Sequence, residues 1–301
     1  MWPRRFPQAA GDEFLDLPDG DFLHLRWWRG GHRRLAILCH GLEGSAEAGY
    51  NQGMAAAMGA AGWDVLGWSY RGCGPRPNRL LRFYHSGATA DLHAVVQHAA
   101  PRYPGGVALV GFSLGGNLAL KYVGEAPAER RVLGAVAISA PVDLAASARA
   151  LDSRWDNRVY LRRFLETLIA KVEAKALVFP GEIDTAGIRL IRSFQEFDDR
   201  YTARLHGFRD AADYWAQSSA RQYLPRITVP ALLLNAKDDP FLPPECFPFP
   251  EAEASTRFFL EAPAHGGHVG FLDLAEGRRG RTWAERRTVE FLDAATSTTL
   301  S

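Results

Sequence analysis

The sequence predicts an α/β protein built on a mostly parallel, doubly wound sheet with helices on both faces. Three observations lead to this prediction. Apolar runs of strand length alternate with stretches of helical pattern. Several of these runs are apolar throughout, which is typical of strands covered on both faces. The chain has 301 residues, enough for one such domain with an insertion, so we expect a single domain over residues 1–301.

The first elements form a predicted β-hairpin. Residues 15–17 and 22–27 alternate apolar with polar side chains, and Pro18-Asp19-Gly20 supplies the residues that a tight turn favours. Residues 34–39 then form a solid apolar run, which predicts a strand buried on both faces.

Further apolar runs and helical stretches follow in alternation. The remaining predicted strands are residues 63–68, 107–110, 132–139, 229–235 and 256–260, and the predicted helices are about 51–61, 88–100 and 282–294, with another after residue 113. Residues 144–225 interrupt the alternation, because they are helical, aromatic and heavily charged and contain no convincing strand. We expect them to form a helical cap over the carboxyl edge of the sheet.

The pentapeptide Gly111-Phe112-Ser113-Leu114-Gly115 joins a predicted strand to a predicted helix. A Gly-x-Ser-x-Gly at such a junction is typical of a nucleophile elbow, which presents its serine at the carboxyl end of a buried strand. The turn needs small residues where backbone segments pass close together, and the two glycines supply them. Ser113 is therefore the predicted nucleophile.

A serine nucleophile needs a base, and the base needs an orienting carboxylate. In this class of fold the acid follows the serine along the chain and the histidine comes last. Asp238 and Asp239 follow the strand at 229–235, and Pro240 fixes the turn directly after Asp239. This favours Asp239 as the acid and Asp238 as a turn or capping residue, although Asp238 stays open as the alternative.

The predicted base lies on a glycine-rich loop after the last strand. The loop contains His265-Gly266-Gly267-His268, and we expect His268 to reach back over Ser113, with His265 as a loop histidine. The histidine pair could instead bind a metal, but no third ligand motif lies nearby, so no metal site is expected.

An oxyanion hole requires two N–H donors, one after the nucleophile and one after an early strand. The backbone N–H groups of Leu114 and Leu42 lie at these positions in the sequence. We expect His40 to shape the loop that carries Leu42 rather than to transfer protons.

Two further groups of residues have alternative interpretations. Tyr84-His85-Ser86 could line a substrate path or cap the helix that follows. The aromatic residues of the predicted cap suit an acyl chain, although aromatic residues at helical spacing commonly serve as ordinary packing; they are Trp155, Phe164, Phe194, Tyr214 and Trp215.

The composition excludes several classes of protein. With 35 basic and 34 acidic residues the net charge is +1, which offers no basic field for nucleic acid. Three cysteines without C-x-x-C spacing fit neither a disulfide framework nor a zinc site, and they favour a reducing compartment. The N-terminal residues lack a signal-peptide pattern, and no apolar run approaches a membrane span of roughly 18 residues. We expect a cytoplasmic protein without stable membrane insertion.

Several of these motifs occur together in one known family. They are residues 18–23, 40–45, 71–74, 84–87, 111–117, 197–200 and 265–271. Together they resemble the α/β-hydrolase fold, and within it the YheT-like branch (the AB hydrolase-4 family) and its eukaryotic ABHD-type kin. The resemblance spans about residues 17–271. The resemblance also implies a longer leader before the first strand than the one at residues 1–14; either such a leader is dispensable or the protein starts further upstream.

Carried over position by position, the resemblance implies Ser113 as nucleophile, Asp239 as acid and His268 as base. It also implies ester hydrolysis or acyl transfer on esters with short or fatty acyl chains, without a cofactor. We therefore predict a serine esterase for small-molecule or lipid-like esters. Acyl transfer to an alcohol and the binding of an apolar ligand without catalysis are the alternatives.

Overall fold

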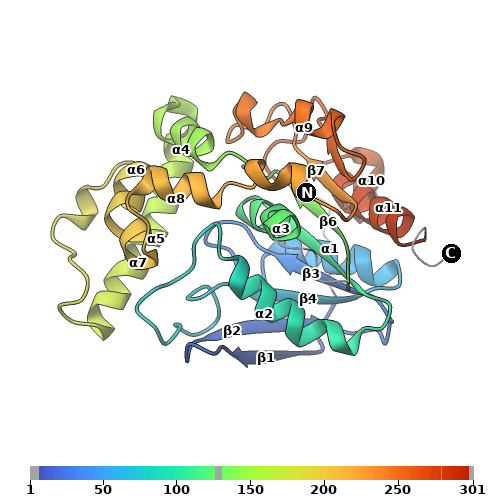
Figure 1. Ribbon diagram of the computed structural model, residues 1–301, viewed down its shortest axis with the longest axis horizontal. Helices are drawn as coiled ribbons and strands as arrows, with labels where there is room; N and C mark the ends of the chain where they lie inside the picture. Colours follow the sequence, from blue (N-terminus) through green and yellow to red (C-terminus); the bar gives the residue numbers. More distant parts are fainter. Residues whose placement is uncertain (1–6, 126–130, 279, 298–301) are drawn as a thin grey trace.

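A computed structural model describes residues 7–125, 131–278 and 280–297, so part of the N-terminal sequence considered above lies outside the described residues. One eight-stranded sheet has the strand order β1-β2-β4-β3-β5-β6-β7-β8. The pairs β1–β2 and β2–β4 are antiparallel, and the other five pairs are parallel. The prediction of a mostly parallel, doubly wound sheet is confirmed (Figure 1).

Each predicted strand overlaps an observed one, although most ends are shifted. The strands are β1 (Gly11–Asp16), β2 (Phe22–Trp28), β3 (Leu35–Cys39), β4 (Asp64–Ser69), β5 (Val107–Phe112), β6 (Val132–Ile138), β7 (Ala231–Leu234) and β8 (Phe258–Glu261). The α-helices are α1 (Gly49–Ala60), α2 (Thr89–Ala99), α3 (Leu114–Glu125), α4 (Leu144–Ser153), α5 (Arg158–Val178), α6 (Phe194–Phe197), α7 (Ala203–His206), α8 (Ala211–Ser218), α9 (Phe249–Glu253), α10 (Leu274–Arg278) and α11 (Trp283–Ser297).

The central strands of the sheet are buried on both faces, as their apolar sequences require. Successive residues of a strand point to opposite faces, and in β3 Leu35 and Ile37 enter one apolar cluster while Ala36 and Leu38 enter another. The first cluster contains residues of α2 and α3, and the second contains residues of α1 and α11. These two helix pairs therefore cover opposite faces of the sheet.

The chain between β6 and β7 contains α4 to α8 and no strand. Figure 1 shows these helices gathered on the left of the molecule, apart from α1 and α11 on the right. Two buried side chains join this part to the rest. Asn117 of α3 accepts a hydrogen bond from the N–H of Ala220 and donates to the Ser218 carbonyl, and Lys175 of α5 donates to the carbonyl of Asn78. We call residues 144–225 the helical segment.

The described residues lack a membrane-spanning helix and a metal-binding cluster. No helix there combines the length and the apolar character that a membrane crossing needs. No group of three or more histidine, cysteine, aspartate or glutamate side chains in the described ranges is placed to hold a metal ion.

Candidate active site

The turn between β5 and α3 holds Ser113 in a left-handed backbone conformation, with φ of 52°. This conformation is uncommon for a residue other than glycine, and such strain is concentrated at functional sites. A Cβ atom at Gly111 would lie 2.1 Å from the carbonyl oxygen of Gly115, and a Cβ atom at Gly115 would lie 2.2 Å from that of Cys39. Both positions therefore require glycine. The absence of a side chain there lets the backbone segments approach closely enough for the sharp turn.

Asp239 and His268 lie together at the carboxyl end of the sheet. Nδ1 of His268 is 2.8 Å from Oδ2 of Asp239, whose side chain has no exposed surface. The other carboxylate oxygen of Asp239 accepts a hydrogen bond from the N–H of Phe241 at 3.0 Å. The Phe241 ring also lies against the imidazole, with centroids 4.4 Å apart, so the His268 ring is held on two sides.

Asp238 points into a different environment. Its carboxylate accepts hydrogen bonds from the N–H groups of Gly266 and Gly267, and its side chain is 41% exposed. These two bonds, the one from Gly267 foremost, hold the pKa of Asp238 below its usual value. Nδ1 of His265 lies 3.4 Å from the same carboxylate. Asp238 and His265 thus shape the loop that precedes His268.

The backbone on either side of His268 is also constrained. Gly267 and Val269 both have positive φ, of 58° and 65°, and for a β-branched residue this is a genuine outlier. The N–H of Val269 donates to the hydroxyl of Ser139 at 2.9 Å, and Ser139 itself has φ of 53°. The loop of the predicted base is therefore anchored to the end of β6.

Ser113 and His268 line one pocket. Within the described ranges, no hydrogen bond joins the Ser113 hydroxyl to His268. In structures without substrate such a bond is often long and tightens only when substrate binds. The structure thus brings Ser113, His268 and Asp239 to one place.

The two predicted oxyanion donors flank the same pocket. Leu42 and Leu114 both line it, and Leu114 is the first residue of α3, so its N–H has no acceptor within the helix. No described residue accepts a hydrogen bond from either N–H. The loop that carries Leu42 passes close to the serine, because a Cβ atom at Gly41 would lie 3.2 Å from Cβ of Ser113.

His40 is a buried structural histidine. Its Nε2 accepts a hydrogen bond from the N–H of Tyr70, so Nδ1 carries the proton and donates to the carbonyl of Gly41 at 2.7 Å. Burial lowers the pKa of His40 to about 3. The neutral imidazole is hydrogen-bonded through both ring nitrogens and holds the loop in place. This agrees with the interpretation from sequence.

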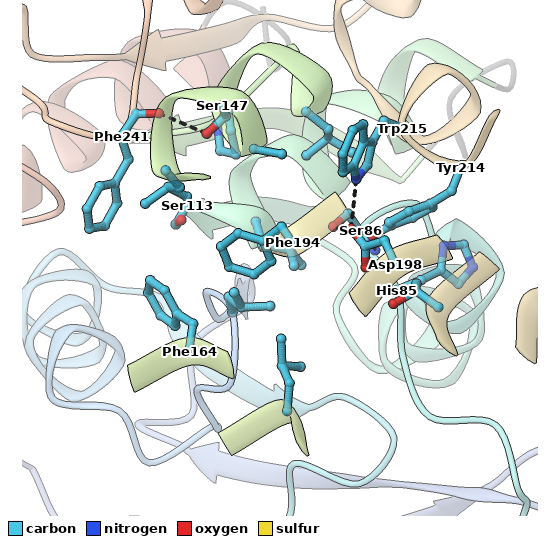
Figure 2. A pocket seen from close by; sticks show the side chains of 18 of the residues that line it. His85, Ser86, Ser113, Ser147, Phe164, Phe194, Asp198, Tyr214, Trp215 and Phe241 are labelled. Atoms are coloured by element: carbon cyan, nitrogen blue, oxygen red, sulfur yellow. Dashed lines mark hydrogen bonds between the residues drawn. The ribbon is translucent and has the colours of Figure 1, made fainter. Parts of the chain in front are cut away.

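The helical segment supplies about half of the residues that line the pocket, and most of these are apolar. They include Leu144, Ala148, Leu151, Phe164, Leu168, Phe194, Tyr214 and Trp215. Of the five aromatic residues considered from sequence, only Trp155 is not part of the lining, and it is 82% exposed. Figure 2 shows Phe164 and Phe194 projecting into the space beside Ser113.

Tyr84, His85 and Ser86 also line the pocket, and Ser86 does not cap α2. The residue at the start of that helix is Ala88, without a side-chain cap. Ser86 instead accepts a hydrogen bond from the Tyr214 hydroxyl at 2.7 Å, and its N–H donates to the same hydroxyl. Of the two interpretations, the structure supports the one in which these residues line a path.

Two polar features were not predicted from sequence. Asp198 is a buried carboxyl in the pocket wall. Glu43, next to Leu42, pairs with Lys171 of α5 at 2.6 Å and accepts a hydrogen bond from Tyr84. The signals for them in the sequence are only indirect, since both residues lie in the motifs that carry the family resemblance. Their partners are distant in the chain.

The sheet, the turn at Ser113 and the His268–Asp239 contact are those of an α/β hydrolase. The sequence pattern of the α/β hydrolase fold family matches residues 36–274, and the chain belongs to this family. It lies on the branch that includes the YheT protein of Escherichia coli (strain K12), whose name proposes an esterase.

The comparisons with relatives extend over most of the chain. The YheT protein is 36% identical over 285 residues, which cover 92% of this chain and 83% of that protein. The mouse phospholipase ABHD3 is 29% identical, over 96% of this chain and 72% of its own length. Among solved structures, the Pyrococcus furiosus esterase PF2001 matches with a TM-score of 0.63 and 18% identity, over 96% of this chain and 91% of the esterase, which shows the shared fold.

Proposed function

We propose that this protein hydrolyses carboxylic esters with Ser113 as nucleophile, His268 as base and Asp239 as the orienting acid. The observation that carries the proposal is the 2.8 Å contact of His268 with the buried Asp239, beside the pocket that Ser113 lines. The esterase and phospholipase names of the relatives support the same reaction.

The proposed reaction begins with attack of the Ser113 hydroxyl on the ester carbonyl. Because the N–H at Nδ1 of His268 donates a hydrogen bond to Asp239, Nε2 has its lone pair free to accept the proton of the serine. The same proton then passes to the leaving alcohol as the acyl-enzyme forms. Water, deprotonated by His268, attacks the acyl-enzyme, and the carboxylic acid and the free serine result.

The N–H groups of Leu42 and Leu114 are the proposed donors to the tetrahedral oxyanion. Their lack of other acceptors supports this role, because preorganised donors need no rearrangement when the negative charge develops. Both donors are backbone groups, so their position depends on the loop and the helix that carry them rather than on the leucine side chains.

We further propose that residues 144–225 act as a cap within a single domain over residues 1–301, as the sequence predicts. The apolar lining that this segment contributes beside Ser113 supports the proposal. A wall of leucine and phenylalanine side chains suits the acyl chain of a short- to medium-chain or lipid-like ester. A cytoplasmic location and the lack of a nucleic-acid partner stay predictions.

The test is hydrolysis of p-nitrophenyl esters from acetyl to dodecanoyl by the parent protein and by Ser113→Ala. We expect turnover by the parent and a loss of about 10⁴-fold or more in kcat for the variant. A fluorophosphonate should label the parent at Ser113 and leave the variant unlabelled. Equal turnover by both proteins, or no turnover and no labelling of the parent, would reject the proposal. Addition of an alcohol and analysis of the products distinguishes acyl transfer from hydrolysis.

A further inference from the structure

The pocket is polar at the end away from Ser113. In Figure 2, Ser86, Asp198, Tyr214 and Trp215 lie together on one side, while Ser113 lies on the other, with Phe194 between them. Two hydrogen bonds link these residues in pairs, since Tyr214 donates to Ser86 and the indole N–H of Trp215 donates to Asp198 at 2.8 Å. We call these four residues the distal polar end.

Asp198 is an unusual group for such a wall. It is only 8% exposed, and burial raises the pKa of its carboxyl to about 7, with the carboxylates of Asp152 and Asp199 adding to the effect. Hydrogen bonds from Thr202 and Trp215 oppose the rise but do not cancel it. An ionised carboxylate accepts up to about four hydrogen bonds, and a protonated carboxyl keeps part of this capacity while it gains an O–H donor. In either state Asp198 keeps acceptor capacity after these two bonds.

Asp198 lies at the start of a π-helical turn, Asp198–Thr202. Such turns are rare and occur frequently at functional sites. A buried carboxyl without a cationic partner also costs stability, and a well-packed apolar residue would avoid that cost. Both observations point to a use for the carboxyl beyond the fold.

Ser86 supplies the complementary group. Its hydroxyl oxygen accepts from Tyr214, so its own proton remains available, and no described residue accepts it. Ser86 is 6% exposed and lines the pocket. The distal polar end therefore presents an acceptor, on Asp198, and a donor, on Ser86.

We propose that the distal polar end binds a hydroxyl group on the part of the substrate that extends away from the ester. This inference rests on the proposed ester hydrolysis and specifies its substrate class, an ester that carries a second, remote hydroxyl. A hydroxyl donates one hydrogen bond and accepts another, so it satisfies Asp198 and Ser86 together. An ammonium group can donate to Asp198 and to the second lone pair of Ser86, but it has no lone pair of its own and leaves the proton of Ser86 without an acceptor.

The test compares three p-nitrophenyl esters of equal chain length, with an unsubstituted, an ω-hydroxy and an ω-amino acyl chain, over lengths from hexanoyl to dodecanoyl. We expect kcat/KM for the ω-hydroxy ester to exceed that for the unsubstituted ester by about 10-fold or more at the matching length. A second series, hexyl octanoate against the octanoate monoester of hexanediol, tests a hydroxyl on the alcohol side. A preference for the hydroxyl in either series supports the proposal.

Variants assign the preference to the site. In Asp198→Asn and in Ser86→Ala, the ratio of kcat/KM values for hydroxylated and unsubstituted esters should fall close to one. Asp156→Asn, a matched change at an exposed aspartate of the helical segment, should leave the ratio as in the parent. Because the ratio is taken within one protein, partial unfolding of a variant changes both of its terms equally.

Three outcomes overturn the proposal. They are the absence of a hydroxyl preference in both series, a larger preference for the ω-amino ester, and a hydroxyl preference that survives in both variants. If the parent hydrolyses the unsubstituted esters while the preference is absent, only this inference fails and the proposed function remains.

Discussion

Two adjacent carboxylates, Asp238 and Asp239, have opposite surroundings. Asp239 is buried against His268, whereas Asp238 is partly exposed and holds the loop at Gly266 and Gly267. We expect Asp239→Asn to lower kcat by about 10⁴-fold, because an amide favours the wrong tautomer of the histidine. Asp238→Asn should change kcat by less than about 10-fold. Steady-state kinetics on a p-nitrophenyl ester checks both variants, and equal losses would contradict the assignment of Asp239 as the acid.

The roles of site residues are most predictable from sequence where the neighbouring residues in the chain form a recognisable local motif. Pro240 after Asp239 and the glycines around Ser113 and His268 are local signals, and the structure brings these three predicted residues together. Asp198 could not be assigned in this way. Its environment depends on Trp215 and on a wall built from separate helices, and neither is visible in the residues beside it.

The buried Asp198 also predicts a pH dependence of stability. Its pKa is raised from an ordinary value of 3.8 to about 7, so between these values the folded protein retains a proton that the unfolded chain has lost. The free energy of unfolding should therefore decrease as the pH rises through this range. Asp198→Asn removes this contribution. Urea unfolding at about pH 5 and about pH 8 should show a smaller decrease for the variant than for the parent, and equal decreases would contradict the prediction.

At the scale of the elements, the close approach of α3 to β3 determines the turn at Ser113. A methyl group at Gly115 would lie 2.2 Å from the carbonyl oxygen of Cys39 and 2.5 Å from that of His40. Both contacts are with backbone atoms, which cannot move aside as a flexible side chain can. We expect Gly115→Ala to cost more than about 3 kcal/mol of the free energy of unfolding, or to prevent folding.

The matched control is Gly59→Ala. Gly59 is an exposed residue of α1, and a Cβ atom there would meet nothing within 4 Å. Alanine has the higher helix propensity, so this variant should be more stable by up to about 1 kcal/mol. Urea unfolding measures both variants. A Gly115→Ala protein as stable as the parent would contradict the packing argument.

The elements differ in how well the sequence predicts them. The strands were predicted because burial on both faces leaves a continuous apolar run. The helices α9 and α10 have five residues each, too few for a helical period to appear. Inside residues 144–225 the sequence indicates helices but not their division, because α6, α7 and the π-helical turn at Asp198–Thr202 have only four or five residues each.

At the scale of the whole molecule, Lys171 joins α5 to the loop that carries Leu42. Its ammonium group pairs with Glu43 at 2.6 Å, and both side chains are nearly buried. We expect Lys171→Met to cost about 3 kcal/mol of the free energy of unfolding, because Glu43 is left buried without its cation. The double variant Lys171→Met/Glu43→Gln should recover part of this loss. Urea unfolding of the parent, of Lys171→Met, of Glu43→Gln and of the double variant gives the coupling energy between the two residues. Additive losses in the double variant would contradict a direct interaction.

The position of the helical segment in the chain has an evolutionary consequence. The chain leaves the sheet after β6 and re-enters it at β7, and these strands are parallel neighbours. The hydrogen bonds between them require only that the connection crosses from one strand to the next, and long connections add little entropic cost with each added residue. Insertions, deletions and recombination within this connection can therefore replace about half of the residues that line the pocket, while the strands that precede Ser113, Asp239 and His268 stay unchanged. A lineage of such proteins can diversify its substrates by exchanging one contiguous stretch of its gene.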